Sequence, residues 1–219
     1  MLMRKEIDKL KRNLLSLSAQ VEEAVIKAVR AVQQRNEVLA REVIDNDPVI
    51  DQREVDLEEE CLKVLALHQP VAVDLRYIIA ILKINNDLER IGDLAVNIAE
   101  RAVSLAQDEQ LDVSFDITAM STEVETMLKK CLNALMELDT KLAYQVIALD
   151  DKVDGMNRDM ITAVLAGIRK YPERSDCLIR FISVSRNLER IADQATNIAE
   201  DVIYLVEGEI IRHRLGEKR

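Results

Sequence analysis

Apolar residues recur at intervals of three and four along almost the whole chain, the spacing of one face of an α-helix. Helix-breaking or capping residues interrupt this pattern at a few places. They are Asn46-Asp47-Pro48, with Asp47 as N-cap and Pro48 at the first helical position, Gln69-Pro70, Asp150-Asp151, Lys170-Tyr171-Pro172, and Gly208 as a C-terminal cap. The breaks predict six helices, near residues 5–45, 48–68, 72–107, 117–148, 151–170 and 175–207.

The second half of the chain repeats the first. Residues 88–100 return at residues 188–200 with 10 of 13 positions identical, and earlier segments repeat more weakly at an offset of 103. Three helices can bury their apolar faces on one another. We therefore predict an all-α protein of two tandem, sequence-related three-helix bundles. The first would span residues 1–106 and the second residues 113–219, with an acidic linker at 107–112.

Composition fits this fold and limits the partners. Aromatic residues make up 3% of the chain, glycine and proline number only five and three, and the formal net charge is −10. That charge argues against nucleic acid and anionic lipid as ligands. No apolar run approaches the ~20 residues that span a bilayer, and the first residues show no secretory leader, so we expect a cytoplasmic protein. Three widely spaced cysteines predict reduced core thiols rather than disulfides.

The repeated segment carries a narrow polar stripe beside its apolar one. At about 100° per residue, its acidic and amide side chains fall nearly opposite the core face, so we expect them to point outward. The stripe consists of Glu89, Asp93, Asn97 and Glu100 in the first copy and Glu189, Asp193, Asn197 and Glu200 in the second. The start of each predicted second helix adds an acidic pair: Asp47 with Asp51, and Asp150 with Asp154.

Acidic residues four positions apart on a helix repel one another, yet both copies keep such pairs on two helices. One interpretation is a bound cation, and oxygen-only ligands favour magnesium, manganese, calcium or iron, with more than one ion per site conceivable. The alternative is a solvated surface that serves solubility. A ferritin-like di-iron site is excluded, because it needs inward carboxylates with Glu-x-x-His, and the only histidines, His68 and His213, lie in no such motif.

Residues 88–93, their copy at 188–193, and Gln69-Pro70-Val71-Ala72-Val73-Asp74-Leu75-Arg76 resemble the signature of the PhoU family, over about residues 10–208. The resemblance implies a non-catalytic cytoplasmic regulator of phosphate uptake that links the ATPase subunit of the phosphate ABC transporter to a membrane sensor histidine kinase. It implies restraint of the phosphate-starvation response when phosphate is plentiful, and a homodimer. The family often has a Met-Gly pair where this chain reads Leu17-Ser18.

The resemblance also assigns metal contacts, because some family members hold metal clusters on Glu/Asp-x-x-x-Asp motifs. These map onto Asp47, Asp51, Glu89 and Asp93 in the first copy and onto Asp150, Asp154, Glu189 and Asp193 in the second, with Asn97 and Asn197 as neighbours. The ion stays open among iron, manganese, magnesium, zinc and nickel. The candidate partner contacts are Arg76, Arg90, Glu100, Arg190 and Glu200. The competing function is metal buffering by the carboxylate clusters.

Overall fold

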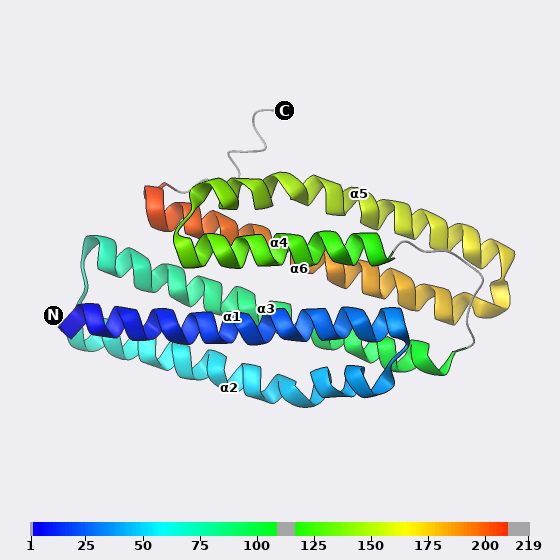
Figure 1. Cartoon of the computed structure of the whole chain (residues 1–219), viewed down its shortest axis with the longest axis horizontal. Coiled ribbons are helices and arrows are strands. Elements are labelled where there is room, and N and C mark those ends of the chain that lie inside the picture. The colour runs from blue at the N-terminus through cyan, green and yellow to red at the C-terminus, as the bar shows by residue number, and fades with distance from the viewer. Residues whose placement is uncertain (1, 109–116, 210–219) are drawn as a thin grey trace.

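The computed structural model describes residues 2–108 and 117–209, which form long α-helices and one short 3₁₀ turn, with no strand in these ranges. The helices are α1 (Leu2–Gln34), α2 (Glu37–His68), α3 (Ala72–Gln107), α4 (Ile117–Glu137), α5 (Thr140–Lys170) and α6 (Ser175–Glu207), with η1 (Pro172–Arg174) before α6. Figure 1 shows α1–α3 as one bundle and α4–α6 as a second bundle alongside it. The predicted all-α fold is confirmed.

The predicted turn between the first two helices of each copy is wrong. α1 ends at Gln34 rather than near residue 45, and α4 ends at Glu137 rather than near residue 148. Arg35 and Leu138 adopt positive φ angles of 50° and 54°, which close the two helices in the left-handed conformation. These residues are 103 apart, so the repeat holds at the turn even though the predicted position of the turn was ten or more residues too late.

Asn36 and Asp139 begin the second helix of each copy as N-caps. Asn36 Oδ1 accepts a hydrogen bond from the backbone N–H of Leu39 at 3.1 Å. Asp139 Oδ1 accepts from the backbone N–H groups of Lys141 and Leu142 at 2.8 and 3.2 Å. Each cap satisfies backbone N–H groups that have no partner within the helix. Asp47 and Asp150, which the sequence placed at these helix starts, lie well inside α2 and α5.

Pro48 lies inside α2. A proline there removes one backbone hydrogen bond and crowds the carbonyl of residue 44, which ordinarily costs about 3 kcal/mol. Val43 and Ile50, on either side of it, are buried in the bundle core, and their packing holds the helix together across the proline. The sequence pattern was therefore misleading at this proline, because tertiary packing overrides the local preference.

Asn36→Ala is expected to lower the free energy of unfolding by about 1 kcal/mol, because the first turn of α2 loses its side-chain acceptor. Asn36→Asp should stay close to wild type, since aspartate caps equally well. Urea denaturation followed by circular dichroism measures both. An Asn36→Ala variant as stable as wild type would show that the cap contributes nothing.

The other predicted helix ends agree with the structure, except that α1 begins at Leu2 rather than near residue 5. α3 begins at Ala72 with Asp74 in its first turn, and Gly208 closes α6 with a φ of 77°. Gln107 belongs to α3, while residues 109–112 of the predicted linker lie outside the described residues, as does His213. The three cysteines are free and buried, and burial raises the pKa of Cys61 to about 12. No helix in the described part is long and apolar enough to cross a membrane.

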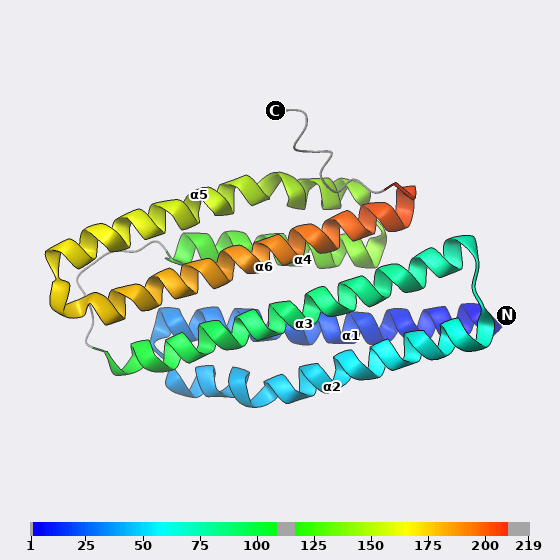
Figure 2. The same cartoon turned by 180° about the vertical axis from the view of Figure 1, so that it is seen from behind.

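α3 and α6 form the seam between the two bundles. They lie side by side and run in opposite directions (Figure 2). Lys83 Nζ of α3 is 3.1 Å from Asp201 Oδ1 of α6, and Arg101 Nε of α3 donates to Ser183 Oγ of α6 at 3.3 Å. Positions 83 and 183 correspond in the repeat, as do 101 and 201. The two contacts are therefore counterparts, and the seam has an approximate twofold axis.

Candidate functional site

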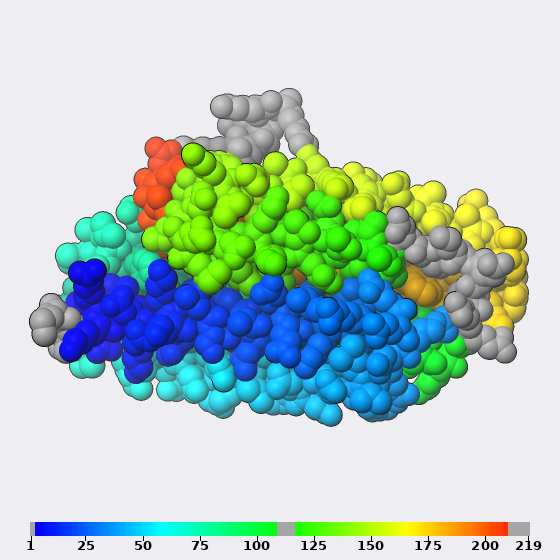
Figure 3. All heavy atoms as spheres, in the orientation of Figure 1, coloured from blue at the N-terminus to red at the C-terminus, as the bar shows by residue number. Residues whose placement is uncertain are grey.

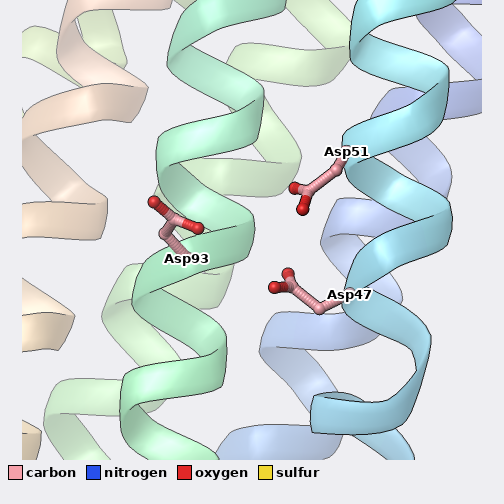
Figure 4. Close-up of side chains that lie close together, drawn as sticks. All are labelled: Asp47, Asp51 and Asp93. Carbon is pink, nitrogen blue, oxygen red and sulfur yellow. The ribbon is translucent and has the colours of Figure 1, made fainter.

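The acidic residues of α2 and α3 meet between these two helices. Asp47 and Asp51 lie one turn apart on α2, Asp93 faces them from α3, and one carboxylate oxygen of each lies within 4.8 Å of the others (Figure 4). Oxygen ligands bind calcium at 2.3–2.6 Å, so oxygens this far apart can share one ion. Among residues 2–108 and 117–209, this is the one group of three or more His, Cys, Asp or Glu side chains so arranged.

Gly92 lets α2 approach α3 beside this group. A Cβ atom at position 92 would lie 3.3 Å from Ile50 Cγ2 and 3.9 Å from Asp47 Oδ1. The second copy has Ala192 at the corresponding position. Sequence reasoning did not single out Gly92, although it is one of the three differences between the two copies of the repeated segment.

Glu54 continues the acidic row of α2 and was also missed. Its Oε1 and its backbone oxygen accept from Asn85 Nδ2 at 2.8 and 2.9 Å. Burial and the nearby charges of Glu58 and Asp51 raise the pKa of Glu54. The sequence signal was available, because Glu54 falls seven positions after Asp47 and three after Asp51 on one helix face.

Within residues 2–108 and 117–209, no basic side chain forms an ion pair with Asp47, Asp51 or Asp93. Burial, followed by repulsion from Asp51 and Asp93, raises the pKa of Asp47 to about 6. Asp47 Oδ1 is buried and has no hydrogen-bond partner among the residues that the structure describes. Burial and Asp51 also raise the pKa of Asp93. A buried carboxylate oxygen without a donor is costly, so either a proton or a divalent cation would stabilise this arrangement.

Glu89, one turn before Asp93 on α3, adds a further negative charge beside this acidic group. Its pKa is raised by burial and then by Asp93, Glu54 and Asp51, while Arg90 acts in the opposite direction. In the predicted outward stripe, Asp93 and Glu100 are exposed, while Glu89 and Asn97 are partly buried. Asp93 also lies beside the acidic residues of α2.

The second copy places its acidic residues similarly but provides partners for them. Asp150 Oδ1 accepts from Thr196 Oγ1 at 3.3 Å, and Asp154 lies 3.8 Å from Arg158. The corresponding first-copy residues are Val96 and Val55, which offer no donor.

Repulsion nevertheless persists in the second copy. Burial, then Glu189, Asp150 and Asp154, raise the pKa of Asp193 to about 6. Burial, then Asp154 and Asp150, also raise the pKa of Glu189, while Arg190 and Arg186 lower it. The two copies therefore offer chemically related sites with different internal bonding.

The remaining predicted residues surround these groups without joining them. Asn97 and Asn197 are partly buried, and Glu200, also partly buried, has an interaction partner. Arg90, Arg190 and Glu100 are exposed on the α3 and α6 faces.

Arg76 differs from these predicted partner contacts. It is partly buried, its Nε has no hydrogen-bond partner, and its guanidinium lies against Gly208 at the end of α6. The structure thus places Arg76 at the junction of the two bundles.

Without divalent cations, the protein is expected to gain stability as the pH falls from 7 to 5. Asp47 binds its proton up to about pH 6 when folded but only to about pH 3.8 as an unperturbed carboxyl. The folded state therefore holds more protons in this window, and the free energy of unfolding falls as the pH rises through it. Allowing for solvent screening, Asp47 should contribute about 1 kcal/mol between pH 5 and pH 7.

Urea denaturation in EDTA at both pH values measures this effect. Asp47→Asn should reduce the difference between the two pH values, and the exposed Asp45→Asn should not. An unchanged difference in Asp47→Asn would contradict the expectation.

Comparison with known proteins agrees with the helical repeat. The model of the PhoU domain matches residues 14–102 and 117–202. The phosphate-specific transport system accessory protein PhoU homolog of Aquifex aeolicus is 41% identical over 96% of this chain and 95% of its own length. The crystal structure of PhoU from Pseudomonas aeruginosa superposes with a TM-score of 0.91 at 36% identity, covering 94% of this chain and 99% of that one.

The crystal structure of the phosphate transport system regulatory protein PhoU from Streptococcus pneumoniae superposes with a TM-score of 0.87 at 27% identity, covering 95% of this chain and 98% of that one. The matches span both three-helix bundles and the acidic positions that lie between their helices. The chain belongs to the PhoU family.

Proposed function

We propose that this chain is an accessory regulator of a phosphate-specific transport system. The observation that carries the proposal is the near full-length similarity to proteins named for that role, among them the Aquifex aeolicus relative. In this proposal the protein works in the cytoplasm, without catalysis of its own. It links the ATPase subunit of the transporter to a membrane sensor histidine kinase and restrains the phosphate-starvation response when phosphate is plentiful.

The charge of the molecule supports docking to basic surfaces. The formal net charge is −10, and both acidic rows lie along helix faces with exposed members such as Asp93 and Asp193. Opposite charges steer association and fix orientation. In this proposal the exposed Arg90, Arg190 and Glu100, with Glu200 and Arg76, contribute partner contacts, and the protein acts as a homodimer.

Binding to the purified ATPase subunit and to the cytoplasmic part of the kinase tests the role directly. We expect a complex with at least one of them, weakened strongly as salt rises from 50 to 300 mM because exposed charges are screened. Deletion of the gene should raise expression of a phosphate-starvation reporter at high phosphate. Absence of any complex, together with an unchanged reporter, would overturn the proposal.

A second function, metal binding, is favoured by the buried, unpartnered Asp47 Oδ1 within the Asp47–Asp51–Asp93 group. In this proposal the first site uses Asp47, Asp51, Glu89 and Asp93 beside Asn97. The second uses Asp150, Asp154, Glu189 and Asp193 beside Asn197. Oxygen-only ligands suit magnesium, manganese or iron, and zinc and nickel remain candidates to be measured.

Elemental analysis of untagged protein, purified with anaerobic supply of these metals, tests binding. The reporter then separates the two functions. A variant without these carboxylates that loses its metal but leaves the phosphate-starvation reporter unchanged would make the protein a metal buffer whose carboxylates do not serve regulation. Loss of both would make the cation part of the regulatory state.

A further inference from the structure

A pocket of about 470 Å³ lies between α1 and α2 of the first bundle. Its polar lining is Gln20, Glu23 and Lys27 from α1, with Glu42, Asp45 and Asn46 from α2. α1 and α2 run side by side along the molecule (Figure 3). Because Asn46 and Asp47 are adjacent on α2, the pocket and the acidic group occupy neighbouring faces of one helix turn.

The pocket has more hydrogen-bond acceptors than donors. Three carboxylates line it beside one ammonium group, and Lys27 Nζ pairs with two of them, at 2.9 Å from Glu23 and 3.6 Å from Glu42. No hydrogen bond or ion pair from the described residues reaches the Asp45 carboxylate. Gln20 Oε1 is buried, and in the described part of the chain it has no hydrogen-bond partner. A ligand that suits this lining brings positive charge and several N–H donors.

The second bundle provides an internal comparison. At the 103-residue offset, Glu23, Glu42 and Asp45 correspond to Thr126, Gln145 and Ala148, while the lysine is kept as Lys130. Gln20 corresponds to Glu123, so this surface carries three carboxylates in the first copy and one in the second, whereas the acidic pairs between helices are preserved in both. Solubility alone would not favour one copy over the other.

We propose that this pocket receives a basic side chain, an arginine guanidinium in the first instance, from a protein partner. The guanidinium is planar, always charged and carries five N–H donors, which matches a donor-poor pocket better than a metal ion does. Glu42 and Asp45 pair with the guanidinium, and Gln20 and Asn46 offer amide oxygens. The partner then approaches the first bundle, so the molecule docks in one orientation. This identification of a docking point rests on the adaptor role proposed above.

The test uses the full-length, ¹⁵N-labelled chain and two peptides, acetyl-Gly-Arg-Gly-amide and its citrulline counterpart, which is neutral and nearly isosteric. We expect the arginine peptide to shift the side-chain amide signals of Gln20 and Asn46, and the citrulline peptide to shift them little. Glu42→Gln with Asp45→Asn should weaken arginine binding about fivefold, the loss of roughly 1 kcal/mol.

A matched control removes two exposed acids of α2 outside the pocket, Glu58→Gln with Glu59→Gln. It changes the net charge equally and should alter arginine binding less than about twofold. Equal binding of the two peptides, or equal weakening by both pairs of substitutions, would overturn the proposed pocket.

Binding of the transporter ATPase subunit to the same variants separates this inference from the proposed function. Weakening by Glu42→Gln with Asp45→Asn alone supports the docking point. Full binding by all variants removes the pocket while the adaptor role stands. No binding of the ATPase subunit by the wild type removes this docking point for it, while the adaptor role is then decided by the kinase complex and the reporter described above.

Discussion

Asp47→Asn combined with Asp93→Asn should weaken manganese binding at the first site at least tenfold. The pair supplies two of the three carboxylates whose oxygens lie within 4.8 Å of one another, and Asp47 Oδ1 has no competing partner. Removal of two anionic oxygen ligands from a site without nitrogen or sulfur ligands leaves too little charge to hold the ion. Isothermal titration calorimetry with manganese chloride measures the change.

The second copy supplies the comparison. Asp150→Asn with Asp193→Asn should have a smaller effect on the affinity of the protein for manganese, because Asp150 and Asp154 already have partners in Thr196 and Arg158. Thr196→Val, which copies the first bundle's Val96, should strengthen binding at the second site. Equal losses from the two double variants would show that internal bonding does not distinguish the sites.

Lys83→Met should lower the free energy of unfolding by about 2–3 kcal/mol, the largest single-residue effect expected at the seam. Asp201 is only 2% exposed, and Lys83 is the cation beside its carboxylate. Lys83 also lies 5.1 Å from the centre of the Tyr204 ring. Methionine keeps much of the apolar stem but removes the ammonium group that lies beside this buried carboxylate. Guanidinium denaturation measures the loss.

The approximate twofold axis of the seam provides the control for this substitution. Arg101→Met, in the counterpart contact, removes the hydrogen bond that Arg101 Nε donates to Ser183 Oγ and should cost about 1 kcal/mol or less. Lys83→Met with Asp201→Asn should recover part of the lost stability, because the buried negative charge is gone. A Lys83→Met variant no less stable than Arg101→Met would show that the ion pair adds nothing.

The helical repeat could be read from the sequence because apolar spacing and an almost identical 13-residue segment report on the core. The positions of the turns within each copy could not be read from the sequence. Pro48 follows a good capping residue, Asp47, and nothing local shows that packing of Val43 and Ile50 carries α2 past it. The true turns depend on Arg35 and Leu138 in left-handed conformations, which neither residue type favours.

The acidic residues of the candidate site were identified from spacing, but their association across helices was not. The positions of side chains around one helix axis do not tell which neighbouring helix those side chains face. The close approach at Gly92 and the different bonding of Asp47 and Asp150 follow from contacts with Ile50 and Thr196, on partner helices. Single-helix patterns contain no information about such contacts.

The twofold seam between α3 and α6 has a consequence for how the protein tolerates dilution. If each bundle were a separate polypeptide, the seam would be a dimer interface whose occupancy falls with concentration. Here both halves belong to one chain, so the local concentration of each for the other does not depend on copy number. Fusion also frees the two sides to differ, because a mutation at position 83 need not appear at position 183. Lys83 and Ser183 are one such divergence, which two identical subunits could not make.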